Sequence, residues 1–293
     1  MICNAHIAGG RKARTAAVLA VTALLVTACA PQDNASGAVG SSTGAGNPFG
    51  HVHGLAVDPG TDQLLVATHN GLFQLGGESP EKIGDTTDLM GFAVVAGRYY
   101  ASGHPGPGSN LPNPLGLVES TDGGQSWQEL SRQGESDFHA MTVSSEGVIG
   151  FDGALRRTAD GTQWSEASDQ VQPAHLAASA DGPVVLATTE EGVQRSTDGG
   201  DTWELPDKAP VLLVTAFADV DTAVGVAPDG TVQLSRDGGV SWETAGGATA
   251  QPSAVAASTE GEDGLRIWVA TEKGIEFSDD AGATFSTTIP AGQ

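Results

Sequence analysis

From residue 51 onward, apolar positions fall into runs of about five residues that alternate with turns rich in Gly, Pro, Asp and Ser. Residues 172–207 show this arrangement clearly, with a strand of small residues predicted at 175–179, an apolar strand at 184–188 and a third strand at 193–196. A turn at 181–183 separates the first two runs, and Gly192 precedes the third. Runs of this length and spacing predict β-strands joined by tight turns. We therefore expect an all-β protein.

An eight-residue motif, Ser-x-Asp-x-Gly-x-(Ser/Thr)-Trp, follows the third strand of most of these units. It stands at 120–127, 196–203, 235–242 and 278–285, where Phe285 replaces the Trp, and a shortened copy occupies 158–164. The copies start at residues 120, 158, 196, 235 and 278, which makes them 38, 38, 39 and 43 residues apart. A repeat of this length with four strands is typical of one blade of a β-propeller.

Counting such units along the chain gives six, at 51–87, 88–132, 137–169, 172–207, 210–246 and 251–290. The first unit lacks the motif but keeps the inner strands. We predict a six-bladed β-propeller of four-stranded antiparallel blades over residues 49–293. Seven blades is the weaker alternative, because too few residues remain for another one.

The acidic residue of the motif has a structural explanation. Asp in a tight turn accepts backbone N–H bonds, Gly supplies a positive φ, and the hydroxyl adds a local hydrogen bond. The aromatic residue that follows can wedge between neighbouring sheets. We therefore predict that these carboxylates hold turns and do not act in catalysis: Asp122, Asp160, Asp198, Asp237 and Asp280.

These motifs resemble Asp-box (BNR) repeats, and over residues 51–290 the chain resembles the sialidase-like β-propellers of the glycosyl hydrolase superfamily. Sialidases of this type carry an Arg-Ile-Pro segment in the first blade, three substrate-binding arginines, a Tyr–Glu nucleophile pair and an acid Asp. This chain has no Arg-Ile-Pro segment and no Arg in the first blade, and its only tyrosines, Tyr99 and Tyr100, fall in the second blade. The resemblance thus implies the scaffold, and the sequence favours a non-catalytic protein over an exo-sialidase-like enzyme.

The N-terminus carries an export signal. Arg11, Lys12 and Arg14 precede an apolar stretch at 16–26, and residues 26–29, Val-Thr-Ala-Cys, match a lipobox. We predict a lipoprotein signal peptide at 1–28, lipid on the thiol of Cys29, and a flexible tether at 29–48. The alternative is a plain secretory peptide with an incidental Cys. The protein would be extracytoplasmic and anchored to the cell membrane by this lipid alone.

Removal of the signal changes the cysteine and charge balance. Cys3 would be lost with the peptide and Cys29 consumed by lipid, so we expect no disulfide in the propeller. The chain has a formal charge of −23, and its first 28 residues hold three basic and no acidic side chains, so the mature charge becomes −23 − 3 = −26. Such a charge disfavours nucleic acid and anionic membrane surfaces and favours cations.

The histidines recur at equivalent places in the predicted blades, where the first strand starts and the second strand ends. In a propeller these places lie on one face, at the mouth of the central channel. The candidate metal ligands are His51, His53, His69, Met90, His104, His139 and His175. Imidazole suits copper, zinc, nickel or iron, and a thioether favours copper, with zinc as the second choice. Asp88 and Asp137 could hold the second ring nitrogens.

Three functions stay open at this point. The first is a lipid-anchored binding protein for a transition metal or another small polar ligand, including a glycan, at this histidine-rich mouth. The second is a sialidase-like glycoside hydrolase, for which the weak catalytic candidates are Asp88, Asp137, Asp152 and Glu190. The third is a protein-interaction scaffold with a protein partner. For each single histidine, the alternative is a structural hydrogen bond between blades.

The second blade also contains an insertion at residues 104–115, where the other blades have a short turn. Its prolines stiffen it, and loops longer than their counterparts tend to be binding elements. We expect this loop to cover the channel mouth and to bring His104 to the site.

Overall fold

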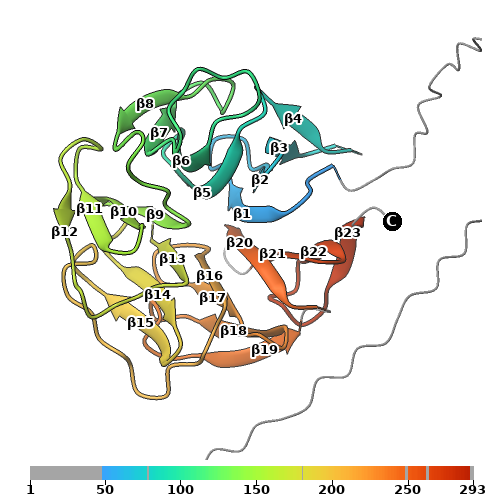
Figure 1. The fold of residues 1–293 in the computed structure, drawn as a ribbon. Helices are drawn as coiled ribbons and strands as arrows, with labels where there is room; N and C mark the ends of the chain where they lie inside the picture. The colour runs from blue at the N-terminus through green and yellow to red at the C-terminus, as the bar shows by residue number, and fades with distance from the viewer. Residues whose placement is uncertain (1–47, 78, 180, 248–249, 262–263, 291–293) are drawn as a thin grey trace, which may run out of the picture. The chain divides into compact units, whose positions relative to one another are not determined.

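The computed structural model describes residues 48–77, 79–179, 181–247, 250–261 and 264–290. Its regular elements in these ranges are β-strands, which form six antiparallel sheets arranged in a ring (Figure 1). The predicted signal peptide, Cys29 and almost all of the predicted tether lie outside the described residues. Within these ranges, no helix has the length and apolar character that a membrane span requires.

Each blade is built from consecutive strands, and the first of them lies at the centre of the ring (Figure 1). The first three blades comprise β1 (Val52–Val57), β2 (Leu64–Thr68), β3 (Gly71–Leu75) and β4 (Glu81–Ile83); β5 (Asp88–Val95), β6 (Arg98–His104), β7 (Leu117–Ser120) and β8 (Gln128–Ser131); and β9 (Ala140–Ser144), β10 (Gly147–Phe151), β11 (Leu155–Thr158) and β12 (Ser165–Glu166).

The last three blades comprise β13 (His175–Ala178), β14 (Val185–Thr189) and β15 (Gly192–Ser196); β16 (Val214–Phe217), β17 (Ala223–Val226), β18 (Thr231–Ser235) and β19 (Glu243–Gly247); and β20 (Pro252–Glu260), β21 (Gly264–Thr271), β22 (Gly274–Ser278) and β23 (Ser286–Pro290). The fourth blade has three named strands, and a single bridge between Arg195 and Glu204 stands where its fourth strand would be. The prediction of a six-bladed all-β propeller is confirmed.

Among the described residues, the core is divided into six apolar clusters, and each lies between two neighbouring blades. β2 shows how one strand serves two clusters. Leu64 and Val66 face the sixth blade, whereas Leu65 and Ala67 face the second. Successive side chains of a strand point to opposite faces, so a sheet between two other sheets needs apolar residues at every position. This explains the continuous apolar runs in the sequence.

The ring is closed by packing between its first and last blades. The inner strands β1 and β20 contact each other, and so do the inner strands of every other neighbouring pair. Phe49, which precedes β1, is 2% exposed, and its ring meets that of Phe73 edge-on at 5.4 Å between centroids. The residues just before the first strand are therefore part of the closing contact.

The Asp-box motifs form compact turns at the ends of their blades. In the fourth blade, Ser196 Oγ accepts a hydrogen bond from Gly200 N (2.8 Å) and donates one to Asp198 Oδ1 (2.8 Å). Asp198 in turn accepts hydrogen bonds from the backbone N (2.9 Å) and the hydroxyl (2.6 Å) of Thr202. Similar bonds within the motif lower the pKa of Asp122 and Asp280 to about 2.

The aromatic residue of each motif packs into the cluster between its own blade and the preceding one. These residues are Trp127, Trp164, Trp203, Trp242 and Phe285. Each motif therefore closes a turn and at the same time joins two blades. The carboxylates at its centre, including that of the shortened copy at Asp160, are engaged by local hydrogen bonds.

We expect Ser196→Ala to lower the free energy of unfolding by about 1–3 kcal/mol, because it leaves the buried Gly200 N–H without its acceptor. The matched control is Ser165→Ala, at an exposed position of β12, for which we expect a change within about 0.5 kcal/mol. Urea denaturation of both variants measures the difference. Equal stability of the two would contradict a structural role for the motif hydroxyl.

Candidate functional site

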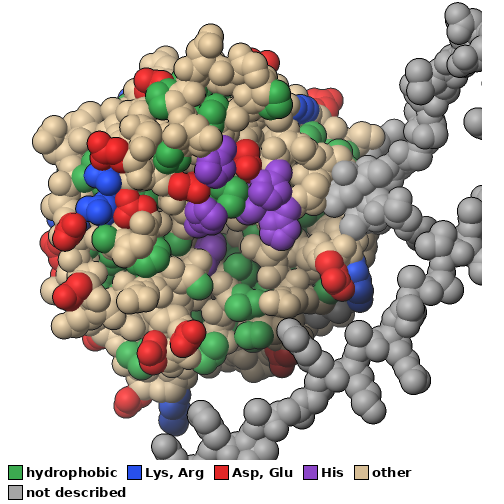
Figure 2. Space-filling view, in the orientation of Figure 1, with side chains coloured by type: hydrophobic (Ala, Val, Ile, Leu, Met, Phe, Trp, Pro, Cys, Tyr) green, Lys and Arg blue, Asp and Glu red, His purple; other side chains and the backbone are tan. Residues whose placement is uncertain are grey.

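The six inner strands surround a central channel with a cavity volume of about 540 Å³. One end of this channel is lined by His53, Met90, His139 and His175, from four successive blades. Figure 2 shows histidine side chains gathered at the centre of this face, with acidic side chains beside them. Residues that the aligned repeats place at equivalent positions therefore lie at the same end of the channel.

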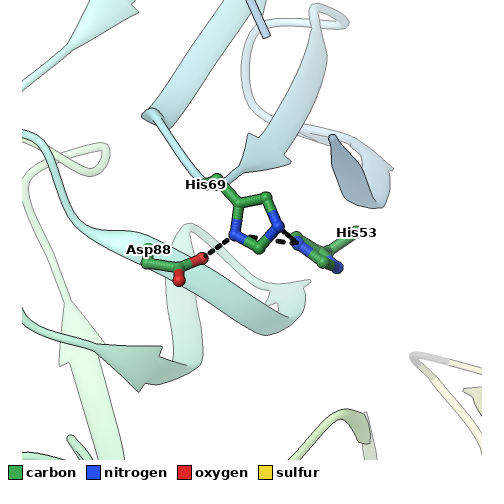
Figure 3. A group of neighbouring side chains, drawn as sticks. All are labelled: His53, His69 and Asp88. Carbon is green, nitrogen blue, oxygen red and sulfur yellow. Dashed lines mark hydrogen bonds and ion pairs between the residues drawn. The ribbon is translucent and has the colours of Figure 1, made fainter. Parts of the chain in front are cut away.

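Two histidines of the first blade and a carboxylate of the second form the tightest group at this mouth (Figure 3). His53 lies in β1, His69 directly follows β2, and Asp88 begins β5. His53 Nε2 is 3.2 Å from His69 Nε2, and His69 Nδ1 is 2.7 Å from Asp88 Oδ1. One donor atom from each of the three residues lies within 4.8 Å of those of the other two.

A third imidazole of the first blade, that of His51, lies against this group. Its ring centroid is 4.8 Å from that of His53 and 5.9 Å from that of His69. His51 and His69 are exposed, and His53 is half-buried at the channel wall. Three imidazoles therefore meet at the rim of the channel.

A β-bulge directs His53 into the channel. The pairing of β1 with β2 runs from Val52 to Gly54 and skips His53, which leaves it as an extra residue in its strand. The same irregularity in β5 skips Met90. A bulged residue leaves the ladder, and its side chain is aimed differently from those of its neighbours. Bulges thus place an imidazole and a thioether at the same level of the channel wall.

The pKa of His53 is lowered to about 4, chiefly because burial disfavours its charged form and also because of the neighbouring imidazoles of His69 and His51. Its ring is therefore neutral at pH 7. Asp88 accepts a hydrogen bond from His69 Nδ1–H, which leaves the lone pair on His69 Nε2. A tetrahedral ion with metal–nitrogen bonds of 2.0–2.1 Å holds two nitrogens about 3.4 Å apart. The 3.2 Å between the two Nε2 atoms is close to that spacing.

The second and third blades contribute a separate group, in which Asp137 is shared by two histidines. Asp137 Oδ2 is 2.9 Å from His139 Nε2 and 3.3 Å from His104 Nε2. His104 Nδ1 is also 2.7 Å from Asn113 Oδ1 in the predicted insertion. This loop is thereby tied to the channel mouth through His104.

His175 stands apart from both groups. Its Nδ1 accepts a long hydrogen bond of 3.5 Å from Thr215 N, in the next blade. The ring lines the channel and is partly buried, and this burial lowers the pKa of His175 to about 4. The structure therefore brings all seven predicted ligands to one end of the channel, where the histidines divide into three groups.

The four predicted carboxylates lie in different environments. Asp88 and Asp137 contact histidines at the mouth. Asp152 accepts hydrogen bonds from Ser136 Oγ (2.6 Å) and Arg156 Nε (3.0 Å). Burial alone would raise its pKa, but these bonds outweigh that effect and lower it. Glu190 is exposed beyond the end of β14.

Sequence reasoning missed the bulges. One signal is present, because a glycine directly follows each bulged ligand, at Gly54 and Gly91. A Cβ on Gly91 would lie 2.2 Å from the backbone oxygen of Phe138, so only glycine permits this approach of the next blade. A His-Gly or Met-Gly pair at the start of an inner strand is thus the sequence signal for these bulges.

The BNR/Asp-box repeat family matches residues 194–205, which include the motif of the fourth blade. The chain is a six-bladed β-propeller that contains an Asp-box repeat. No curated protein sequence matches this one significantly.

Among solved structures, the Asp-box propeller is similar to the GH74 xyloglucanase from Xanthomonas campestris, with a TM-score of 0.57 and 14% identity over 82% of this chain. It covers only 38% of the length of that enzyme. It is also similar to virginiamycin B lyase from Staphylococcus aureus, with a TM-score of 0.53 and 14% identity over 80% of this chain and 84% of the other. At this identity, the likenesses establish the fold.

The lowered pKa of His53 predicts its titration in the absence of metal. Its folded pKa of about 4 lies below the unfolded value of 6.5, so the folded ring stays neutral down to about pH 4. Folding stability from this group is present above pH 6.5 and is lost as pH falls toward 4. We expect the His53 ring resonances in an NMR titration to shift with a midpoint near 4. A midpoint near 6.5 would contradict the described environment.

Proposed function

We propose that this Asp-box propeller binds a transition metal ion at its channel mouth through His51, His53 and His69. The observation that carries the proposal is the 3.2 Å distance between the Nε2 atoms of His53 and His69. The other ring nitrogen of His69, Nδ1, is hydrogen-bonded to Asp88. Metal-bound histidines usually donate their other N–H to a carboxylate or carbonyl, which fixes the ring and raises its basicity. The His69–Asp88 contact has this form.

Copper is the favoured ion in this proposal. Imidazole ligands suit copper, zinc, nickel and iron, and a thioether shifts the preference toward copper. Met90 supplies a thioether at the level of His53, since both are the bulged residues of neighbouring inner strands. The formal charge of −23 further favours a cation as ligand.

Metal binding is tested on the purified protein by titration calorimetry and by mass spectrometry of metal content. We expect one high-affinity copper ion per chain at pH 7.5 and weaker binding at pH 4, because a metal binds neutral imidazoles and protons compete for them. His53→Ala combined with His69→Ala should abolish this binding. His104→Ala removes an imidazole from the neighbouring group and should change the affinity by less than about threefold.

Competition with zinc tests the preference for copper in the same experiment. Met90→Leu keeps the volume of the side chain but removes the sulfur, so it should lower copper affinity relative to zinc. Stoichiometric copper binding that persists in the double histidine variant would overturn the proposed site.

We also propose that the protein works outside the cytoplasm, held at the cell membrane by lipid on Cys29. The support is the basic segment, the apolar stretch and the Val-Thr-Ala-Cys sequence at 26–29. We expect Cys29→Ser to move the protein from the membrane fraction to the soluble fraction and to abolish incorporation of labelled palmitate. Unchanged palmitate incorporation in this variant would contradict the anchor.

A sialidase-like or other glycoside hydrolase is the second candidate, supported by the family resemblance and by the two carboxylates at the mouth. Asp88 and Asp137 face the histidines there, whereas Asp152 is neutralised by its arginine partner. Hydrolysis of an aryl sialoside that is lost in Asp88→Asn or Asp137→Asn would favour this candidate over metal binding. A protein-interaction scaffold would show neither metal binding nor hydrolysis.

A further inference from the structure

The proposed metal ligands hold the ion from one side. His51, His53 and His69 all belong to the first blade, at the rim of the channel. In a ring of six blades, the wall opposite the first blade is the fourth, which contributes His175 to the lining of the same channel. An ion on the first blade therefore keeps coordination positions that are open toward the channel.

The space beside this site is much larger than a metal-bound water requires. The channel has a volume of about 540 Å³, whereas one water occupies about 30 Å³ of liquid. Sites for small organic molecules have volumes of roughly 300–1,000 Å³. Below the histidines, the wall includes the apolar side chains of Leu55, Phe92 and Leu176. The channel is therefore of the size and character that suits a small organic ligand.

His175 presents a hydrogen-bond donor to this space. Its Nδ1 accepts the Thr215 N–H, so in the neutral ring the proton is on Nε2. Within the described part of the chain, Nε2 has no hydrogen-bond partner, and the ring lines the channel. The lowered pKa keeps this ring neutral at pH 7. A ligand in the channel would satisfy this donor with a carboxylate or carbonyl oxygen.

Charge restricts the class of ligand. Beyond the apolar section, the channel is lined by Asp62, Asp181 and Asp219, and the whole chain has a formal net charge of −23. A polyanionic ligand is therefore disfavoured. An α-amino acid carries a single carboxylate. Its amine and carboxylate together chelate a transition metal, and an apolar side chain fits the wall.

We propose that the channel binds a small apolar α-amino acid that coordinates the metal ion, with its carboxylate also accepting a hydrogen bond from His175. The inference rests on the proposed metal site and specifies what completes its coordination. No covalent bond is made or broken in the amino acid skeleton. The α-ammonium group loses one proton to the buffer, and its lone pair takes up the open coordination position.

The test uses labelled L-leucine in equilibrium dialysis against the full protein with and without copper. We expect one leucine per copper-loaded chain and at least 10-fold weaker binding to the copper-free protein. The matched control ligand is 4-methylpentanoate, which has the carbon skeleton and carboxylate of leucine but no amine. It should bind at least 10-fold more weakly than leucine to the loaded protein.

Substitutions at His175 test the opposite wall. His175→Ala should weaken leucine binding about 10-fold, and His175→Gln, which restores an N–H donor, should recover most of the affinity. Leucine that binds equally without copper, that fails to bind the loaded protein, or that strips the copper would overturn the inference. A protein that takes up no copper in direct titration would instead remove the proposed metal site, so the two failures are distinguishable.

Discussion

Packing between neighbouring blades is the constraint on which the rest of this structure depends. A single blade cannot bury both of its faces, so each apolar cluster is shared by two sheets. The closed ring therefore requires all six clusters. Leu65 at 1% and Val66 at 0% exposure show the result, because adjacent residues of one strand are buried against different blades. The Asp-box aromatics extend these clusters toward the outer turns.

The same packing creates the site. The inner strands of neighbouring blades contact each other around the ring, and their starts lie together at one end of the channel. Residues separated by tens of positions in the chain, such as His53 and His139, become neighbours there without any local contact in sequence. Bulges at His53 and Met90 aim these two side chains into the channel, whereas His175 reaches it from a regular ladder.

The chemistry of the mouth follows from partial burial. His53 is shielded enough to stay neutral, and the hydrogen bond from His69 Nδ1–H to Asp88 leaves His69 Nε2 as an acceptor 3.2 Å from His53 Nε2. The imidazoles of His104 and His139 both contact a different carboxylate, that of Asp137. One face thus carries a group of imidazoles, around His53 and His69, that is suited to a cation. A second group, around Asp137, contacts the proline-rich loop through His104. The channel between them and His175 leaves room for a further ligand.

The sequence by itself determined the architecture, because an Asp-box repeated every 38 to 43 residues, together with short strands that include apolar runs, leaves few alternatives to a propeller. It also determined which residues share the channel mouth, since equivalent repeat positions become equivalent places in a ring. Only the tertiary structure decided how those residues divide. His53, His69 and Asp88 form one group and His104, Asp137 and His139 another, because bulges, the angle between blades and the path of the insertion set the side-chain directions. Repeat spacing does not contain the distances between side chains, so the 3.2 Å between the imidazoles of His53 and His69 could come only from the folded chain.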